Sequence, residues 1–244
     1  MLRIAMSEHL KMRHTFVGKL PVIAPVFSLC LVFLLAYRAM DMVPPMAWNF
    51  WYTILLPGMV AIICCLGVNK DKKLHYCNML SVPFPAAKCL AGKLLYYSAG
   101  LFFANMVLCA GIFISGKISG TAIGITGSLL AVILLSFVFL WEIPLYIMLS
   151  IYSGMSACLI SCMFMVFSGV LLANTRLWWI WPPSIPARLM CPVLGIMPNG
   201  ILAPEGSPLL DSNVILPGII ISFIWFVLMA FIMVLCFNKK VVEE

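Results

Sequence analysis

Charged side chains are scarce in this chain: Asp, Glu, Lys and Arg make up 9% of its 244 residues, whereas hydrophobic residues make up 64%. Soluble domains carry about 25% charged residues. So little charge could not keep a folded chain of this length in water, which excludes a soluble globular protein. We therefore expect an integral membrane protein whose surface is mostly in contact with lipid.

Sequence motifs of enzymes are absent as well. The chain has no Gly-x-x-x-x-Gly-Lys-[Ser/Thr] phosphate loop, no His-Glu-x-x-His zinc motif and no Gly-x-Ser-x-Gly nucleophile motif. We expect no catalytic residue, no cofactor bound by this chain, and no ATP hydrolysis of its own. An integral membrane enzyme is a third interpretation that no motif supports.

Metal-ligating patterns are missing too. There are only three His residues, and the ten Cys residues form no Cys-x-x-Cys pair. Zinc sites need Cys and His at short spacings. Most of the cysteines fall within apolar segments, where free Cys behaves as a small hydrophobic residue. No metal site is expected.

What the sequence does contain is six long apolar segments. Each is close to the roughly 17–25 residues that a membrane-crossing helix needs. They are continuous runs rather than the alternating segments of membrane barrels, so helices are expected. The predicted spans are residues 20–37, 50–68, 94–115, 121–143, 155–173 and 214–237. The predicted fold class is all-α integral membrane, with residues 20–244 forming one six-helix domain.

Lys and Arg are distributed unevenly between the two sides that six spans define. The N-terminal arm, the loop between the second and third spans and the C-terminal tail hold eleven of them, and the opposite side holds four. Because Lys and Arg concentrate in cytoplasmic loops, both termini are predicted to be cytoplasmic. The basic clusters are interpreted as anchors to anionic membrane lipids, with no nucleic acid as a partner.

Residues 1–19 are predicted to form an amphipathic helix along the cytoplasmic interface. Leu2, Met6, Leu10 and Val17 fall on one face of this helix, and Arg3, Ser7, Lys11 and His14 fall on another. His9 and Arg13 interrupt the apolar side, so a disordered basic arm is the alternative.

Two loops are expected to carry function. On the cytoplasmic side, residues 74–80 favour a short helix that Pro83 and Pro85 terminate, which is either a docking element for a partner or an ordinary solvated loop. On the outer side, residues 174–213 contain seven prolines and three tryptophans. Because Trp prefers the membrane interface, we expect short outer or re-entrant helices here, before the last span.

Glu142 is the one acidic residue within the predicted spans. Ionisable residues at membrane depth mark ion or proton pathways by default, but a single one gives little support to a proton-coupled transporter. We interpret Glu142 as a carboxylate near the cytoplasmic end of the fourth span that reaches water. The alternative is a gate or a contact to a docking ATPase.

Eight short motifs occur in a fixed order along the chain. They are SEHLKMRHTF at 7–16, NFWYT at 49–53, LPG at 56–58, KDKKL at 70–74, LSVP at 80–83, WWIWP at 178–182, PAR at 186–188 and LGIMPNG at 194–200. Together they resemble the permease subunits of lantibiotic self-immunity ABC transporters, a branch of the ABC-2-type exporters. The fourth and fifth spans match mainly in hydropathy.

This resemblance implies an ABC-2 fold with a cytoplasmic connecting helix at residues 1–19, six spans, and short re-entrant helices between the last two. It implies a complex with two copies of an ABC ATPase, which bind ATP and Mg, and with a second related permease or a second copy of this chain. The implied ATPase-coupling residues are Lys72, Lys73, Leu74, Tyr76, Met79, Leu80 and Ser81. Pro85 departs from the more polar residue expected after the LSVP motif.

The implied function is ATP-driven expulsion of lantibiotic-type antimicrobial peptides from the plasma membrane of a Gram-positive bacterium, giving immunity or resistance. Expected outer-face contacts with the peptide are Trp178, Trp179, Trp181 and Arg188, although lipid anchoring explains the tryptophans equally well. The alternatives are an ABC-2 permease for another hydrophobic substrate, such as a lipid or haem, and a secondary transporter without an ATPase.

Overall fold

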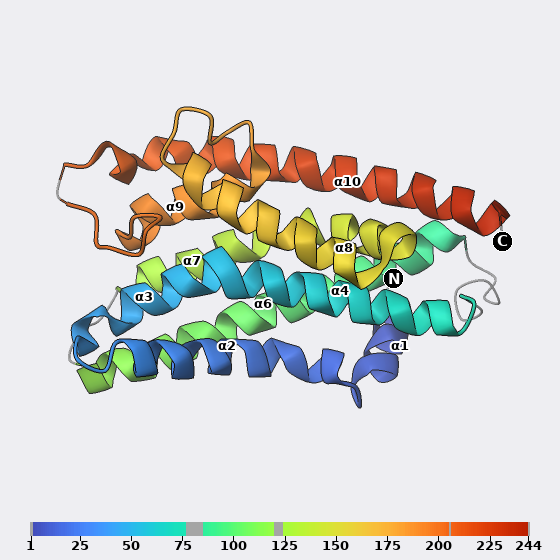
Figure 1. Cartoon of the computed structure of the whole chain (residues 1–244), viewed down its shortest axis with the longest axis horizontal. Helices are drawn as coiled ribbons and strands as arrows, with labels where there is room; N and C mark the ends of the chain where they lie inside the picture. The colour runs from blue at the N-terminus through green and yellow to red at the C-terminus, as the bar shows by residue number, and fades with distance from the viewer. Residues whose placement is uncertain (1, 77–84, 120–123, 205, 244) are drawn as a thin grey trace.

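The computed structural model describes residues 2–76, 85–119, 124–204 and 206–243. These residues form an elongated bundle of helices with both termini toward the same end (Figure 1). The segments long and apolar enough to cross a membrane are Phe16–Leu35, Met40–Lys73, Ala86–Lys117, Ile125–Ala173 and Ser212–Lys239. The prediction of an all-α, multi-pass membrane protein is confirmed at the level of these five segments.

The N-terminal region begins with two helices, α1 (Leu2–Met12) and α2 (Phe16–Leu35). The chain turns at residues 13–15, so the last residues of the predicted 1–19 helix belong to α2. Gly18 allows this tight turn, because a Cβ there would come within 2.6 Å of the Met12 carbonyl oxygen.

The amphipathic pattern of α1 is oriented with its apolar face away from the protein. Leu2, Met6 and Leu10 are between 60% and 74% exposed, whereas Glu8 is buried against the bundle. A helix that lies at a membrane interface turns its apolar side to lipid in this way. The charged side chains of α1 are therefore available for contacts inside the protein.

The most enclosed rod of the bundle consists of α3 (Val43–Phe50), one π-helical turn (Trp51–Leu55) and α4 (Leu56–Lys73). Pro57 lies in the first turn of α4 and has no N–H to donate, so one carbonyl of the preceding turn loses its backbone partner. Single π-turns of this kind are frequent at functional sites. In the most apolar stretch of this rod 72% of residues are buried, compared with 11% in the C-terminal segment.

The chain continues through α6 (Ala86–Ser119), α7 (Ile125–Val138) and α8 (Glu142–Ala173). α8 is interrupted at Gly154, where φ is 81° and ψ is −170°, a conformation that is essentially restricted to Gly. The chain folds back here, because the Tyr146 hydroxyl lies 3.9 Å from Met165 Sδ. In one straight helix these two residues would be about 28 Å apart.

The loop before the last long helix is built from short elements packed on the protein. A 3₁₀ turn (Pro182–Ser184) leads into α9 (Ile185–Leu194), which is buried against α7, α8 and α10 (Ile215–Glu243). Gly195 ends α9 in the left-handed conformation that commonly closes a helix. The predicted outer loop thus contains a short, protein-packed helix.

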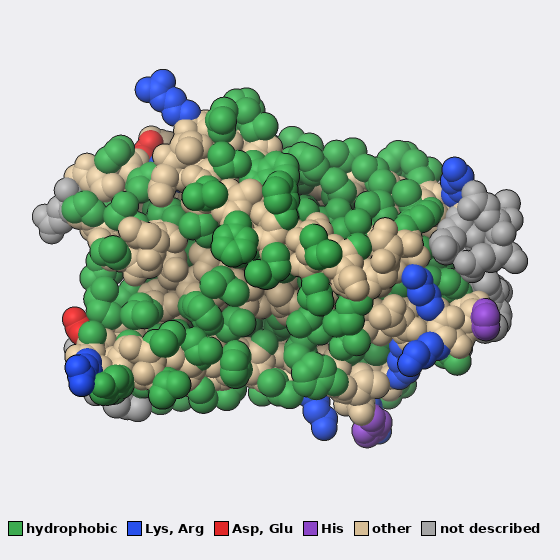
Figure 2. Space-filling model, viewed as in Figure 1, with side chains coloured by type: hydrophobic (Ala, Val, Ile, Leu, Met, Phe, Trp, Pro, Cys, Tyr) green, Lys and Arg blue, Asp and Glu red, His purple; other side chains and the backbone are tan. Residues whose placement is uncertain are grey.

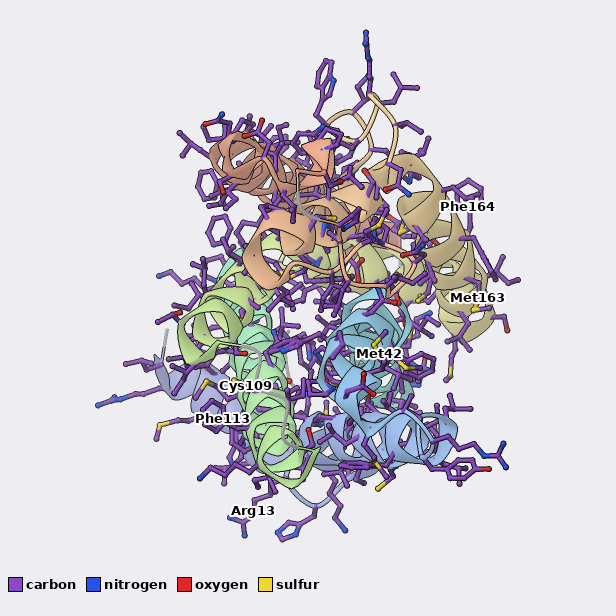
Figure 3. The ribbon with its side chains drawn as sticks, turned by 90° about the vertical axis from the view of Figure 1, so that its left-hand side faces the viewer. Arg13, Met42, Cys109, Phe113, Met163 and Phe164 are labelled. Carbon is purple, nitrogen blue, oxygen red and sulfur yellow. The ribbon has the colours of Figure 1, made fainter. Side chains whose placement is uncertain are left out.

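Hydrophobic side chains cover the middle of the visible face, and many of the Lys, Arg and His side chains lie at its ends (Figure 2). Figure 3, viewed along the bundle, shows Met163 and Phe164 pointing outward from α8, with 55% and 63% exposure. A surface this apolar is stable in lipid rather than in water. We call the end where α4 finishes and α1 packs the basic end, and the end that holds α9 the loop end.

Candidate functional site

Four of the seven predicted ATPase-coupling residues are described: Lys72, Lys73, Leu74 and Tyr76 lie at the end of α4, whereas Met79, Leu80 and Ser81 lie outside the described residues. Lys73 and Leu74 are exposed. Lys72 Nζ donates a hydrogen bond to the Ser150 carbonyl oxygen of α8 at 2.7 Å. The buried ring of Tyr76 meets Phe237 of α10 edge-on, with ring centroids 5.6 Å apart. The end of α4 is therefore tied to two other helices.

An open groove of about 410 Å³ lies at the end of α4 and is lined by Leu66, Asn69, Lys70, Lys72 and Lys73. Three of the five lining side chains are lysines. Like charges gathered on one surface raise the local potential and attract groups of the opposite sign. The groove is therefore suited to negatively charged groups.

Four charged side chains from α1, α4 and α6 form a closed ring of ion pairs near the end of α4. Lys11 Nζ of α1 lies 2.9 Å from Glu8 Oε2 and 2.5 Å from Asp71 Oδ1 of α4. Lys93 Nζ of α6 lies 3.0 Å from the same Glu8 oxygen and 2.5 Å from Asp71 Oδ2. Two acids and two bases alternate, so the ring is neutral as a whole.

The ring is largely withdrawn from water. The side chains of Asp71 and Lys93 are 2% exposed, and those of Glu8 and Lys11 are 11% and 13% exposed. Burial lowers the pKa of Lys11, but the hydrogen bond and charge of Asp71 and the charge of Glu8 outweigh it and raise this pKa above its ordinary value. Lys11 is therefore charged at neutral pH, as the pairing requires.

Two further contacts seat α1 beside the ring. Lys70 Nζ donates a hydrogen bond to the Lys11 carbonyl oxygen at 2.6 Å, which satisfies a carbonyl of the last turn of α1 that has no partner within the helix. Gly92 of α6 allows close approach, because a Cβ there would run into the Ile4 side chain. α1 is thus fixed to both α4 and α6.

Glu142 does not reach water, contrary to the prediction. Its side chain is 2% exposed and shares a cavity with Tyr52, Pro183 and Ala187, close to the loop end. The prediction is wrong because the apolar segment continues past Glu142 to Ala173. After α7 ends at Val138 and residues 139–141 interrupt the helix, α8 begins at Glu142 with Pro144 in its first turn, where proline is tolerated.

The four predicted peptide contacts differ in exposure. Trp179 is 53% exposed, Trp178 and Trp181 are half-buried, and Arg188 is 7% exposed. Arg188 Nη1 donates a hydrogen bond to the Leu209 carbonyl oxygen at 2.6 Å, so its charge holds the loop to α9. Trp179 is the most accessible of the four.

Sequence reasoning missed the ring. It assigns Lys11 to the polar face of an interfacial helix and Lys93 to the charges that set topology, and it gives no role to either acid. Two local signals were present. Glu8 precedes Lys11 by one helical turn, a spacing at which opposite charges meet, and Asp71 interrupts a run of lysines at the end of an apolar segment.

No protein-family model, curated protein or solved structure matches this chain. The resemblance to ABC-2-type permeases is therefore carried by the sequence motifs alone. Within residues 2–76, 85–119, 124–204 and 206–243, no group of three His, Cys, Asp or Glu side chains lies close enough together to hold a metal ion.

Proposed function

We propose that the chain is a permease subunit of an ABC-2-type exporter that expels lantibiotic-type peptides from the membrane of a Gram-positive bacterium. The eight sequence motifs supply the family assignment. Two features of the arrangement support it: α1 packs across the basic end, where the resemblance implies a connecting helix, and α9 packs on protein before the last long helix, where it implies a re-entrant helix.

The proposal requires six membrane crossings, and we assign two of them to Ile125–Ala173. Its 49 residues would measure about 73 Å as one straight helix, more than twice the roughly 30 Å of hydrocarbon in a bilayer. The reversal at Gly154 would separate the two crossings. The basic end would then face the cytoplasm with both termini, in agreement with the excess of Lys and Arg.

The single observation that carries the coupling role is the set of contacts at the end of α4. Within residues 71–76, Asp71 pairs with lysines of α1 and α6, Lys72 bonds to α8, and Tyr76 contacts α10. A displacement of residues 71–76 would therefore be transmitted to four helices, α1, α6, α8 and α10. We propose that two copies of an ATPase, which bind ATP and Mg, dock here, with a second permease or a second copy of this chain completing the pore.

The peptide would be bound at the outer membrane interface and expelled from there to the outside. Lantibiotic-type peptides are cationic and amphipathic, and their apolar side chains prefer the headgroup region. Trp179, exposed at the loop end, offers an aromatic surface at that depth. No catalytic residue is required of this chain, because the energy would come from ATP hydrolysis on the partner subunits.

A pull-down tests the partnership first. The tagged chain would be isolated from its native host in mild detergent, and its partners would be identified by mass spectrometry. Recovery of a P-loop ATPase and a second multi-pass protein is expected. Clean recovery of the stable chain alone would reject the exporter and leave the secondary transporter as the better interpretation.

A charge reversal tests the docking surface. Lys73→Glu is expected to weaken recovery of the ATPase about tenfold, corresponding to ~1.4 kcal/mol, and to reduce protection against lantibiotic peptides in a resistance assay. Lys117→Glu is the matched control, since Lys117 is equally exposed and lies on the side predicted to be extracellular. Equal effects of both changes would contradict docking at the basic end. If the wild-type chain bound the ATPase but gave no protection against lantibiotic peptides, the substrate would instead be another hydrophobic molecule, such as a lipid or haem.

A further inference from the structure

Glu142 lies where three interruptions of helical structure meet. The first is the π-helical turn Trp51–Leu55 with Pro57 behind it, the second is the break between α7 and α8, and the third is the 3₁₀ turn Pro182–Ser184. Side chains from all three interruptions line one cavity with Glu142. Interrupted helices leave backbone polar groups without a partner in their own helix.

The cavity has the size of one water molecule. Its volume is about 20 Å³, and a cavity of roughly 10–15 Å³ already accommodates a water. Most of the lining is apolar, with Phe139, Val166 and Pro186 as examples. A hard cation takes about six oxygen ligands, which this lining does not offer. A proton on the carboxyl group and a single water suit the site better than a metal ion.

No cation faces the Glu142 carboxyl group among the described residues that line the cavity. Its Oε2 atom is enclosed and has no hydrogen-bond partner in the described part of the chain. The titratable groups that face it are Tyr52 on the π-helical turn, Cys64 on α4, and Tyr146 and Cys162 on α8. Phenols and thiols are uncharged at neutral pH, so none of them balances a carboxylate.

The cation on the neighbouring helix α9 is engaged elsewhere. Arg188 donates its hydrogen bonds to the carbonyl oxygens of Leu209 and Pro208 in the loop. An ionised carboxylate enclosed without a counter-charge is so unfavourable that such groups take up a proton instead. The geometry therefore favours the neutral acid.

We propose that Glu142 is a proton-binding site, at which the carboxyl group carries a proton in the folded bundle and donates a hydrogen bond to one water molecule in the cavity. When the interruptions separate and bulk water enters, the O–H bond breaks, the proton passes to water, and the carboxylate is solvated. Opening of the bundle at this point is thereby linked to release of one proton, and rising pH favours the open form. This property is independent of which substrate or partner the chain has.

Infrared spectroscopy of the full chain in lipid nanodiscs tests the protonation state directly. The chain has only eight acidic residues, and the buried Glu8 and Asp71 are each paired with two lysines, so few carboxyl groups compete in the spectrum. We expect a C=O stretching band of a protonated carboxylic acid near neutral pH, lost as the pH rises beyond about 9. Absence of that band in the wild-type protein near neutral pH would overturn the proposal without any variant.

Two substitutions assign the band. Glu142→Gln is expected to remove it and to stay folded, because the amide is neutral, similar in size and able to donate a hydrogen bond to the same water. Asp211→Asn, which removes an exposed carboxylate at a loop capping position, is expected to leave the band unchanged. A band that persists in Glu142→Gln would show that another residue carries the proton.

The linkage to opening has its own readout. The thermal unfolding midpoint of the wild-type chain is expected to fall between about pH 6 and about pH 9, because deprotonated Glu142 favours states in which it is hydrated. The midpoint of Glu142→Gln is expected to vary less over the same range. Identical pH dependence in the two proteins would contradict the linkage.

Discussion

Two places in this bundle enclose carboxyl groups, and they differ in what neutralises them. At the basic end, Glu8 and Asp71 each lie within 3.0 Å of two lysine side chains. Near the loop end, the described residues that line the Glu142 cavity include no cation, and the proposed proton takes the place of the partner. A membrane bundle can bury an acid by pairing it with lysines of other helices or, as proposed for Glu142, by keeping it protonated.

The packing around the ring and around the Glu142 cavity explains why only the ring pairs its acids with lysines. The ring lies where α1 crosses the ends of α4 and α6, so long lysine side chains from two elements can converge on two acids while Glu8 and Lys11 keep a little contact with water. The cavity lies among apolar side chains, and the cation of α9 is bonded to the loop. Only the first setting places lysine side chains beside its acids, and such partners offset the cost of burying a charge.

The largest expected loss of stability comes from removing a lysine partner from the ring at the basic end, so that a buried acid there lacks a counter-charge, as Glu142 does among the described residues that line its cavity. Lys93→Met removes one base from the ring and leaves an acid without its full counter-charge. We expect a loss of about 3–5 kcal/mol in the free energy of unfolding. Thermal unfolding in detergent, followed by tryptophan fluorescence, measures it.

A second substitution and a control sharpen this test. Adding Glu8→Gln to Lys93→Met restores the balance between Lys11 and Asp71, so we expect partial recovery of the unfolding midpoint. Lys19→Met removes an exposed charge and should change stability by no more than about 0.5 kcal/mol. If Lys93→Met behaves like Lys19→Met, the ring does not hold the helices together.

A smaller effect is expected at the reversal in α8, which brings Met165 beside the wall of the Glu142 cavity. Gly154→Ala places a side chain at φ 81°, and we expect destabilisation of about 1–3 kcal/mol from backbone strain. No atom lies within 4 Å of the added Cβ, so packing contributes little. An unchanged midpoint would mean that the reversal tolerates other conformations.

The smallest effect is expected where α1 rests on α6. Gly92→Ala would push against Ile4, and the cost of overpacking, ~1–3 kcal/mol, is partly offset by the gain in helix propensity, ~1 kcal/mol. We expect a net loss of about 1 kcal/mol. Gly58→Ala is the matched control for both glycine changes, since nothing lies within 4 Å of its added Cβ and a small stabilisation is expected. A gain in stability from Gly92→Ala would show that α1 is loosely seated.

Much of the fold follows from composition and pattern. Continuous apolar runs predicted long helical segments, five of which are long and apolar enough to cross a membrane, because lipid requires every backbone group to be satisfied within a helix. The sequence also predicted a helix at the N-terminus and a short packed element before the last segment. It did not predict that Glu8 of α1 is buried against the bundle, since an amphipathic pattern does not state which distant residues the polar face meets.

The candidate sites were less predictable. Lys73 and Leu74 were named from the motifs and are exposed at the basic end, whereas the ring beside them was not foreseen. Glu142 was named as the one acid in the predicted spans but was expected to reach water, whereas it is buried. Its burial depends on α9 and on the reversal at Gly154, neither of which changes the hydropathy of the segment around Glu142.

Local composition and the nature of the solvent were enough to predict a membrane protein, helical segments and an excess of basic residues on one side. Which charges meet depends instead on tertiary packing. Glu8 and Lys93 are 85 residues apart in the chain, and the ring to which they belong requires α1, α4 and α6 to pack in one arrangement. The isolation of Glu142 likewise arises from packing, since a residue is buried or exposed only in relation to distant parts of the chain.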